Sequence, residues 1–205
     1  MKKIISILVL LTVSSCSFFK KSSPGPLDIT EVNPNKMTAL TKKHLIKLTR
    51  TYDLTPFLYS REVKIESYVT PRSHPVITLN TRSASSPEKI LSKLLHEEFH
   101  WWAVANPEKT DAAIAELKEK FPRIHGYDEI LINKSTYLHL GICWLEYKAL
   151  EKYIGEEKAK AVITDIMKVD KVYPRIYAMV LRKQSEIGAI LQKNSLVPPA
   201  LKGNI

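Results

Sequence analysis

The stretch "LHEEFHWW" at residues 95–102 brings two imidazoles and two carboxylates into one short segment. His96 and His100 are four positions apart, so on a helix they project from the same face and can bind one metal ion. Glu97 lies about 100° around the helix from His96, next to this pair. The HExxH pattern predicts that His96 and His100 bind zinc and that Glu97 acts as a general base toward a zinc-bound water molecule.

The helix that must carry these side chains is predicted over residues 86–105. Ser85 and Glu88 form a capping-box pattern, and Pro87 suits the first turn. Apolar residues cover most of the circumference: Ile90, Leu91, Leu94, Leu95, Phe99, Trp101, Trp102 and Val104. A helix that is apolar nearly all round is buried, and burying His or Glu without a partner is costly. A metal ion therefore explains the polar groups better than a solvated face, while Glu98 is expected in solvent or in a supporting role next to the metal ligands.

A catalytic zinc ion takes three protein ligands, so a third ligand is expected on a later helix. In "STYLHLGICWLEYKALEKY", His139 and Glu146 are seven positions apart and share one face of an otherwise apolar helix. We predict Glu146 as the third ligand and His139 as a catalytic residue, either holding a ligand in place or stabilising an oxyanion. These two roles could also be exchanged. Glu129 and Glu151 are less favoured alternatives.

These residues resemble the zincin metallopeptidases, in particular the gluzincins, whose third ligand is a Glu on a helix downstream of HExxH. The resemblance rests on residues 96–100 and on Glu146. It implies zinc as the cofactor and a small sheet packed on the active-site helix, with an edge strand that pairs with extended peptide substrate. Tyr or His often stabilises the transition state in such enzymes, which makes Tyr127, Tyr137 and His125 candidates.

The remaining pattern predicts the elements around that helix. Residues 61–80 alternate between apolar and polar positions around a Pro-containing turn, which favours two strands of an antiparallel sheet. A basic amphipathic helix is predicted over 38–50, and later helices are punctuated by Pro122 and Gly155. The expected fold class is α+β, mostly helical, with one zincin-like domain over residues 37–205.

The N-terminal segment is typical of export. Two lysines precede an unbroken apolar run over residues 4–13, and "VSSCS" follows. This resembles the lipobox of a bacterial lipoprotein, which implies removal of residues 1–15 and a lipid anchor on Cys16. Residues 16–36 are rich in Ser, Pro and Asn, and a flexible tether is expected there. Ser17 is not the Asp that favours inner-membrane retention, so the outer membrane is the expected location in the cell envelope.

The formal net charge of +10 over 205 residues favours anionic surroundings such as phospholipid headgroups or cell-wall polymer. Nucleic acid is not an expected partner, because the Lys and Arg residues are scattered rather than clustered with aromatic residues. If Cys16 carries lipid, Cys143 has no intramolecular disulfide partner and is expected in the core.

Together these patterns predict a lipid-anchored zinc metallopeptidase that cleaves peptide bonds in a protein or peptide of the cell envelope. An amidase acting on cell-wall peptides is a closely related possibility. The alternative class is a non-catalytic envelope lipoprotein, a scaffold or chaperone. Its polar groups would form a core network or hold a structural metal.

Overall fold

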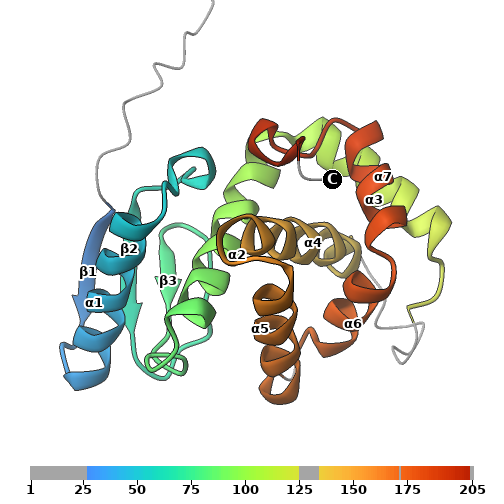
Figure 1. Ribbon diagram of the computed structural model, residues 1–205. Coiled ribbons are helices and arrows are strands. Elements are labelled where there is room, and N and C mark those ends of the chain that lie inside the picture. The colour runs from blue at the N-terminus through green and yellow to red at the C-terminus, as the bar shows by residue number, and fades with distance from the viewer. Residues whose placement is uncertain (1–26, 125–133, 171, 204–205) are drawn as a thin grey trace, which may run out of the picture.

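The computed structural model of the chain describes residues 27–124, 134–170 and 172–203. The strands are β1 (Asp28–Val32), β2 (Glu62–Glu66) and β3 (Ile77–Leu79). The α-helices are α1 (Lys36–Thr51), α2 (Pro87–Ala105), α3 (Pro107–Lys120), α4 (Lys134–Ile154), α5 (Glu156–Val169), α6 (Pro174–Arg182) and α7 (Gln184–Lys193). Short 3-10 turns lie at η1 (Thr55–Phe57) and η3 (Pro199–Leu201). Figure 1 shows the sheet and α1 on one side of the molecule and the later helices on the other, where α4 contacts α2, α3, α5, α6 and α7.

The sheet is parallel, in the order β1-β2-β3, so the predicted antiparallel pairing is wrong. The polar alternation of β2 misled the prediction, because it reports which face is covered and not which way the strands run. Val63 and Ile65 are buried while Lys64 is exposed, so β2 has one solvated side although the sheet is parallel. Helix α1 supplies the crossover that a parallel β1–β2 pair requires.

Strand β1 lies within residues 16–36, the segment predicted to be a tether. Asp28–Val32 pairs residue by residue with β2, so the domain begins before the predicted boundary at residue 37. The predicted lipidation site and signal segment fall in residues 1–26, outside the described residues. None of the helices in the described part of the chain is long and apolar enough to span a bilayer.

Helix α1 confirms the amphipathic helix predicted over 38–50, and its start is well capped. The Asn35 side chain accepts hydrogen bonds from two backbone N–H groups of the first turn, and the Thr38 hydroxyl accepts from the Asn35 backbone. Leu45 and Leu48 face the core. The helix thereby fixes one side of the sheet against α2.

Helix α2 confirms the helix predicted over 86–105, with one shift at its start. Its N-cap is Ser86 and not Ser85, and the Ser86 hydroxyl accepts a hydrogen bond from the Lys89 backbone N–H at 3.4 Å. The helix ends at Ala105, and its C-cap Asn106 precedes the proline that begins α3. It packs on β3, α1, α4 and α5, which explains why apolar residues occur on nearly every side of it.

Helix α4 is held at the centre of the helical side by an unusually close neighbour. Trp144 lies over Gly188 of α7, where an added Cβ would come within 2.6 Å of the indole. The Trp144 indole N–H also donates to the Gln184 carbonyl at 2.8 Å. As predicted, the chain breaks at Gly155, whose φ of 82° favours glycine. These contacts set the depth at which α4 presents its polar residues to α2.

Candidate metal centre

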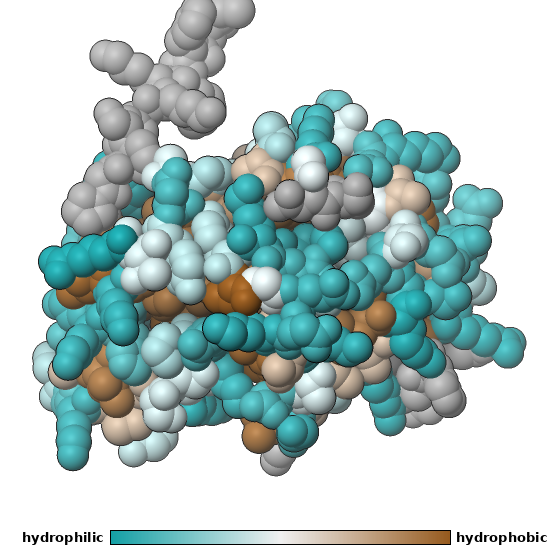
Figure 2. Space-filling model, in the orientation of Figure 1, coloured by the Kyte–Doolittle hydropathy of each residue, from teal (hydrophilic) through white to brown (hydrophobic). Residues whose placement is uncertain are grey.

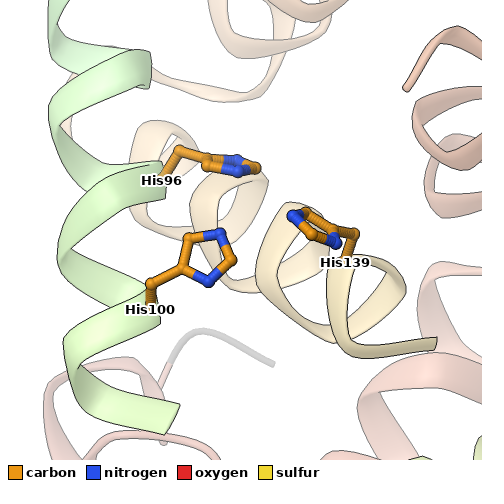
Figure 3. A group of neighbouring side chains, drawn as sticks. All are labelled: His96, His100 and His139. Atoms are coloured by element: carbon orange, nitrogen blue, oxygen red, sulfur yellow. The ribbon is translucent and has the colours of Figure 1, made fainter. Parts of the chain in front are cut away.

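Three imidazoles converge between α2 and α4. His96 and His100 extend from α2 and His139 from α4, and Figure 3 shows the three rings directed toward one another. Each ring offers a nitrogen, and these nitrogens all lie within 4.8 Å of one another. His96 and His139 are buried, while His100 is only partly so. This three-histidine group is compact and open to solvent at one edge.

Two hydrogen bonds define the tautomer of His139. Its Nδ1–H donates to the Ser135 carbonyl one turn earlier, at 2.7 Å, so Nε2 carries the lone pair. The Tyr173 hydroxyl lies 2.8 Å from that Nε2 and donates to it, with the two rings stacked at a centroid distance of 4.3 Å. A metal ion bound to His139 would take this lone pair and release the phenol beside it.

Glu146 lies behind His96, on the far side of the ring from the other two imidazoles. The His96 Nδ1–H donates to the Glu146 carboxylate at 2.9 Å. The same carboxylate accepts from the Tyr177 hydroxyl at 2.8 Å and from the Ser92 hydroxyl. With Glu146 1% exposed, it is these donors that make its burial tolerable. The arrangement directs the Nε2 of His96 toward His100 and His139.

The structure brings His139, rather than Glu146, into line with the histidine pair of α2. The two residues share one face of α4, but seven positions separate them by about 10 Å along the axis. Only one can therefore lie level with the pair, and the other lies level with Ser92, a turn before His96. This geometry fits the exchange of roles that the sequence pattern left open, with His139 as the candidate ligand.

A second group of possible ligands consists of His96, Cys143 and Glu146, again with ligand atoms within 4.8 Å of one another. It shares His96 with the first group. Burial raises the pKa of the Cys143 thiol to about 11, so a metal ion bound through this sulfur would have to displace its proton. The three-histidine group requires no such deprotonation of a thiol.

The protonation states of two histidines suit metal binding. Burial, with a smaller effect of the His96 charge, lowers the pKa of His100 to about 2 and that of His139 to about 4. Both rings are therefore neutral at pH 7, the form that binds metal. For His96, burial acts to lower the pKa, but the Cys143 and Glu146 side chains outweigh it and raise the pKa well above its usual value.

Glu97 lies next to His96 and is 6% exposed. Burial raises the pKa of its carboxyl, and the neighbouring His96 acts in the opposite direction. The ammonium of Lys93, one turn earlier on α2, also favours the ionised form; it donates to the Asn80 side chain at 2.7 Å. Glu97 forms no hydrogen bond to another described residue, so its oxygens are available to accept a proton.

Glu98 points to the opposite side of α2 and has a structural role there. One carboxylate oxygen accepts the backbone N–H groups of Tyr59 at 2.7 Å and Ser60 at 2.9 Å. The other is buried without a hydrogen-bond partner among the described residues. Burial raises the pKa of Glu98 to about 8. Neither of the two environments expected for this residue is observed, since Glu98 is buried and hydrogen-bonds to no candidate metal ligand in the described part of the chain.

The other predicted candidates lie away from the site or outside the described residues. Tyr137 donates its hydroxyl to the Phe121 carbonyl at 2.9 Å and is buried. Glu151 forms an ion pair with Lys148. Three further candidates fall in the segment 125–133, outside the described residues: His125, Tyr127 and Glu129.

Sequence reasoning missed three hydroxyls that complete the site. Tyr173 and Tyr177 stand four apart in "YPRIY" at the start of α6, and Ser92 stands four before His96 on α2. In each case the i, i+4 spacing puts both groups on one helix face, which is the available signal. Their partners lie on other helices, and the sequence alone does not identify them.

The edge of the sheet differs from what the zincin resemblance implies. β1 and β3 are the two edge strands, and β3 is the one that contacts α2. The N–H and C=O of its central residue, Thr78, already pair with Arg72 at 2.7 and 3.1 Å. An extended peptide could pair with this edge at Thr78 only by displacing the chain's own Arg72.

Comparison with protein-family models, with curated proteins and with solved structures gives no match for this chain. Function must therefore be argued from the site itself. The site combines three convergent imidazoles, a buried carboxylate without a hydrogen-bond partner among the described residues, and a phenol that touches one of the imidazoles. This combination could hold a divalent metal ion and move a proton next to it.

Proposed function

We propose that the protein is a zinc-dependent hydrolase in which His96, His100 and His139 hold the ion. The observation that carries this proposal is the convergence of the three imidazole nitrogens within 4.8 Å, beside the buried carboxylate of Glu97. Three protein ligands leave a fourth tetrahedral position open, which is the arrangement of catalytic zinc.

The donor set fits zinc in two further respects. Zinc–nitrogen distances of about 2.0–2.1 Å place tetrahedral ligand atoms about 3.4 Å apart, so a small inward movement of these rings suffices. His96 and His139 each donate the other ring N–H to an oxygen, Glu146 and the Ser135 carbonyl. Such bonds fix the tautomer and orientation of metal-binding histidines.

Each of the nearby groups then has a role in hydrolysis. When bound, zinc polarises the substrate carbonyl and lowers the pKa of water to about 7. Glu97 accepts the proton of the attacking water and passes it to the leaving amine. The Tyr173 hydroxyl, released from His139, donates a hydrogen bond to the oxygen on which negative charge develops. Glu146 keeps His96 oriented throughout.

The substrate we propose is the amide bond of a peptide or protein in the cell envelope, with a cell-wall peptide as the related case. The location follows from the lipobox-like segment ending at Cys16, which would anchor the chain to a membrane. The occupied edge at Thr78 argues that substrate enters along α2 and α4, rather than by extending β3.

Metal content and turnover test this proposal together. The chain from Ser17 onward, which retains every described element, should contain about one zinc ion per molecule by elemental analysis, lost on chelation and regained with added zinc. Hydrolysis of a mixed peptide library should follow the metal. Glu97→Gln should keep zinc and lower turnover roughly 100-fold or more. A chain that takes up no zinc, or a fully active Glu97→Gln variant, would falsify the proposal.

One observation favours the structural-metal alternative. The Tyr173 hydroxyl lies 2.8 Å from His139 Nε2, close enough for the phenol to become a fourth ligand and close the site. In that case Tyr173→Phe should weaken zinc binding, whereas in the hydrolase it should leave zinc bound and reduce turnover.

A further inference from the structure

Helix α1 carries an uncompensated row of positive charge. Its 16 residues include five Lys or Arg and no acidic residue. Lys42 pairs with Glu31 of β1 at 3.5 Å. The other four have no ion pair with a described residue, and all are exposed: Lys36, Lys43, Lys47 and Arg50. We refer to these four residues as the α1 basic face.

The spacing puts these residues on one side of the helix. Lys43, Lys47 and Arg50 follow each other at four and three positions, and Lys36 lies two turns before Lys43. The buried positions of the same helix, Leu45 among them, point to the core instead. In the space-filling view, hydrophilic side chains project from the region of α1 with apolar ones between them (Figure 2).

Cations elsewhere on the surface are more often neutralised. On the helical side, several lysines reach a carboxylate within 4 Å: Lys89 and Lys168 to Asp165, Lys120 and Lys183 to Glu186, and Lys193 to Glu116. The α1 basic face lacks such partners among the described residues. Like charges four residues apart on a helix repel one another, so this face gains from an external anion.

One end of the α1 basic face, at Arg50, lies beside Leu27, the first described residue. β1 leads into α1, which runs back along the sheet, so the last turn of α1 returns to the start of β1 (Figure 1). A groove of about 310 Å³ marks this point. Leu27 lines it together with Ile46 and Arg50 of α1.

We propose that the α1 basic face docks on the anionic phospholipid headgroups of a membrane. Ten residues separate Cys16 from Leu27, and a chain of that length spans at most roughly 35 Å. A lipid on Cys16 would keep the last turn of α1 within that reach. Each Lys or Arg near an anionic leaflet strengthens binding by roughly fivefold.

Docking through α1 leaves the three-histidine site accessible. In Figure 1, α1 and α4 lie on opposite sides of α2, and the histidines lie between α2 and α4. A domain seated on a membrane through α1 therefore turns the site toward the aqueous side. This inference does not depend on the proposed zinc chemistry, since none of its residues touches the metal centre.

Vesicle binding of the unlipidated chain from Ser17 onward tests the surface. The charge reversal Lys43→Glu with Lys47→Glu is compared with Lys158→Glu with Lys160→Glu. The second pair is exposed on α5 and changes the net charge equally. Flotation with vesicles of phosphatidylglycerol in phosphatidylcholine should show binding that weakens roughly 25-fold or more in the α1 variant. The α5 variant should bind within about twofold of wild type, and Lys43→Arg with Lys47→Arg should bind normally.

Two further measurements identify the partner. Binding should vanish on pure phosphatidylcholine and fall steeply as salt shortens the Debye length from about 10 Å at 0.1 M. Equal losses in the α1 and α5 variants, or equal binding to zwitterionic vesicles, would overturn the proposal. Soluble polyphosphate that binds as tightly as vesicles at equal phosphate concentration would also overturn it, in favour of an anionic polymer. Circular dichroism shows that each variant is folded.

Discussion

The two sides of α2 each bury a carboxylate, but they satisfy it in different ways. Toward α4, Glu146 accepts hydrogen bonds from three side chains, one of them the imidazole of His96. On the opposite side, Glu98 accepts two backbone N–H groups, from Tyr59 and Ser60. Both carboxylates are almost fully buried.

This difference distinguishes Glu146, which belongs to the candidate site, from Glu98, which is a structural anchor. Backbone donors are fixed by the fold, so Glu98 holds the segment before β2 against α2 and leaves one oxygen unpartnered among the described residues. A side-chain donor can itself take part in metal binding, so Glu146 can orient the imidazole of His96 toward a metal ion. Changes on the α4 side should therefore affect metal and turnover, and changes at Glu98 should affect stability alone.

The largest effect is expected from removing the imidazole contributed by α4. His139→Ala leaves two histidine ligands where catalytic zinc needs three. Zinc should be absent after dialysis, as measured by elemental analysis, and hydrolysis should fall to background. His74→Ala is the matched control, since His74 stacks on Trp101 outside the three-histidine group and should keep its zinc. Zinc retained by His139→Ala at wild-type affinity would contradict the ligand assignment.

The second effect concerns the phenol that touches His139. Tyr173→Phe keeps the stacked ring and removes only the hydroxyl, so kcat should fall by roughly 10²–10³ while zinc content and KM change little. Tyr137→Phe is the control, because that buried hydroxyl donates to the Phe121 carbonyl, away from the three-histidine group. If Tyr173→Phe loses zinc, and turnover does not depend on the hydroxyl, Tyr173 is instead a fourth ligand that closes the metal site.

The local parts of this architecture were predictable and the long-range parts were not. The periodicity of α1 and α2 and the break at Gly155 depend on residues that are close together in the sequence. These predictions are confirmed. β1 is a five-residue strand beside Pro and Asn, and its pairing partner β2 lies beyond a helix. Strand direction depends on that distant pairing, so a local alternation did not determine it.

The candidate site likewise has a local part that was predictable from the sequence and a long-range part that was not. His96, Glu97 and His100 follow from spacing within one helix turn, whereas the choice between His139 and Glu146 depends on how far α4 slides along α2. That position depends on contacts with segments far along the chain, such as the packing of Trp144 on Gly188 of α7. A seven-residue spacing indicates that two residues share one face of a helix. It does not determine which of them lies level with the histidine pair along the helix axis.

A smaller effect is expected from Glu146→Gln, the direct counterpart of the Glu98 change. The amide still accepts hydrogen bonds, but it lacks the charge that holds the His96 Nδ1–H. Zinc affinity should fall by roughly 10–100-fold, as measured by competition with a chelating dye. Glu98→Gln, measured in parallel, should bind zinc as tightly as wild type. Equal losses in the two variants would remove the distinction between site and anchor.

Glu98→Gln is expected to have the smallest effect on the metal centre. It should instead change how the free energy of unfolding depends on pH. Burial raises the pKa of Glu98 from 4.5 to about 8, so the folded protein holds this proton more tightly than the unfolded chain. The resulting stability is fully present below pH 4.5 and is lost as pH rises through 8. The free energy of unfolding should be measured by urea unfolding with chelator present. From pH 5 to pH 8.5 it should fall on the order of 2–4 kcal/mol more in wild type than in the variant, because Gln does not titrate. Parallel pH profiles for the two proteins would mean that Glu98 is ionised throughout, with its two backbone donors outweighing the cost of burial.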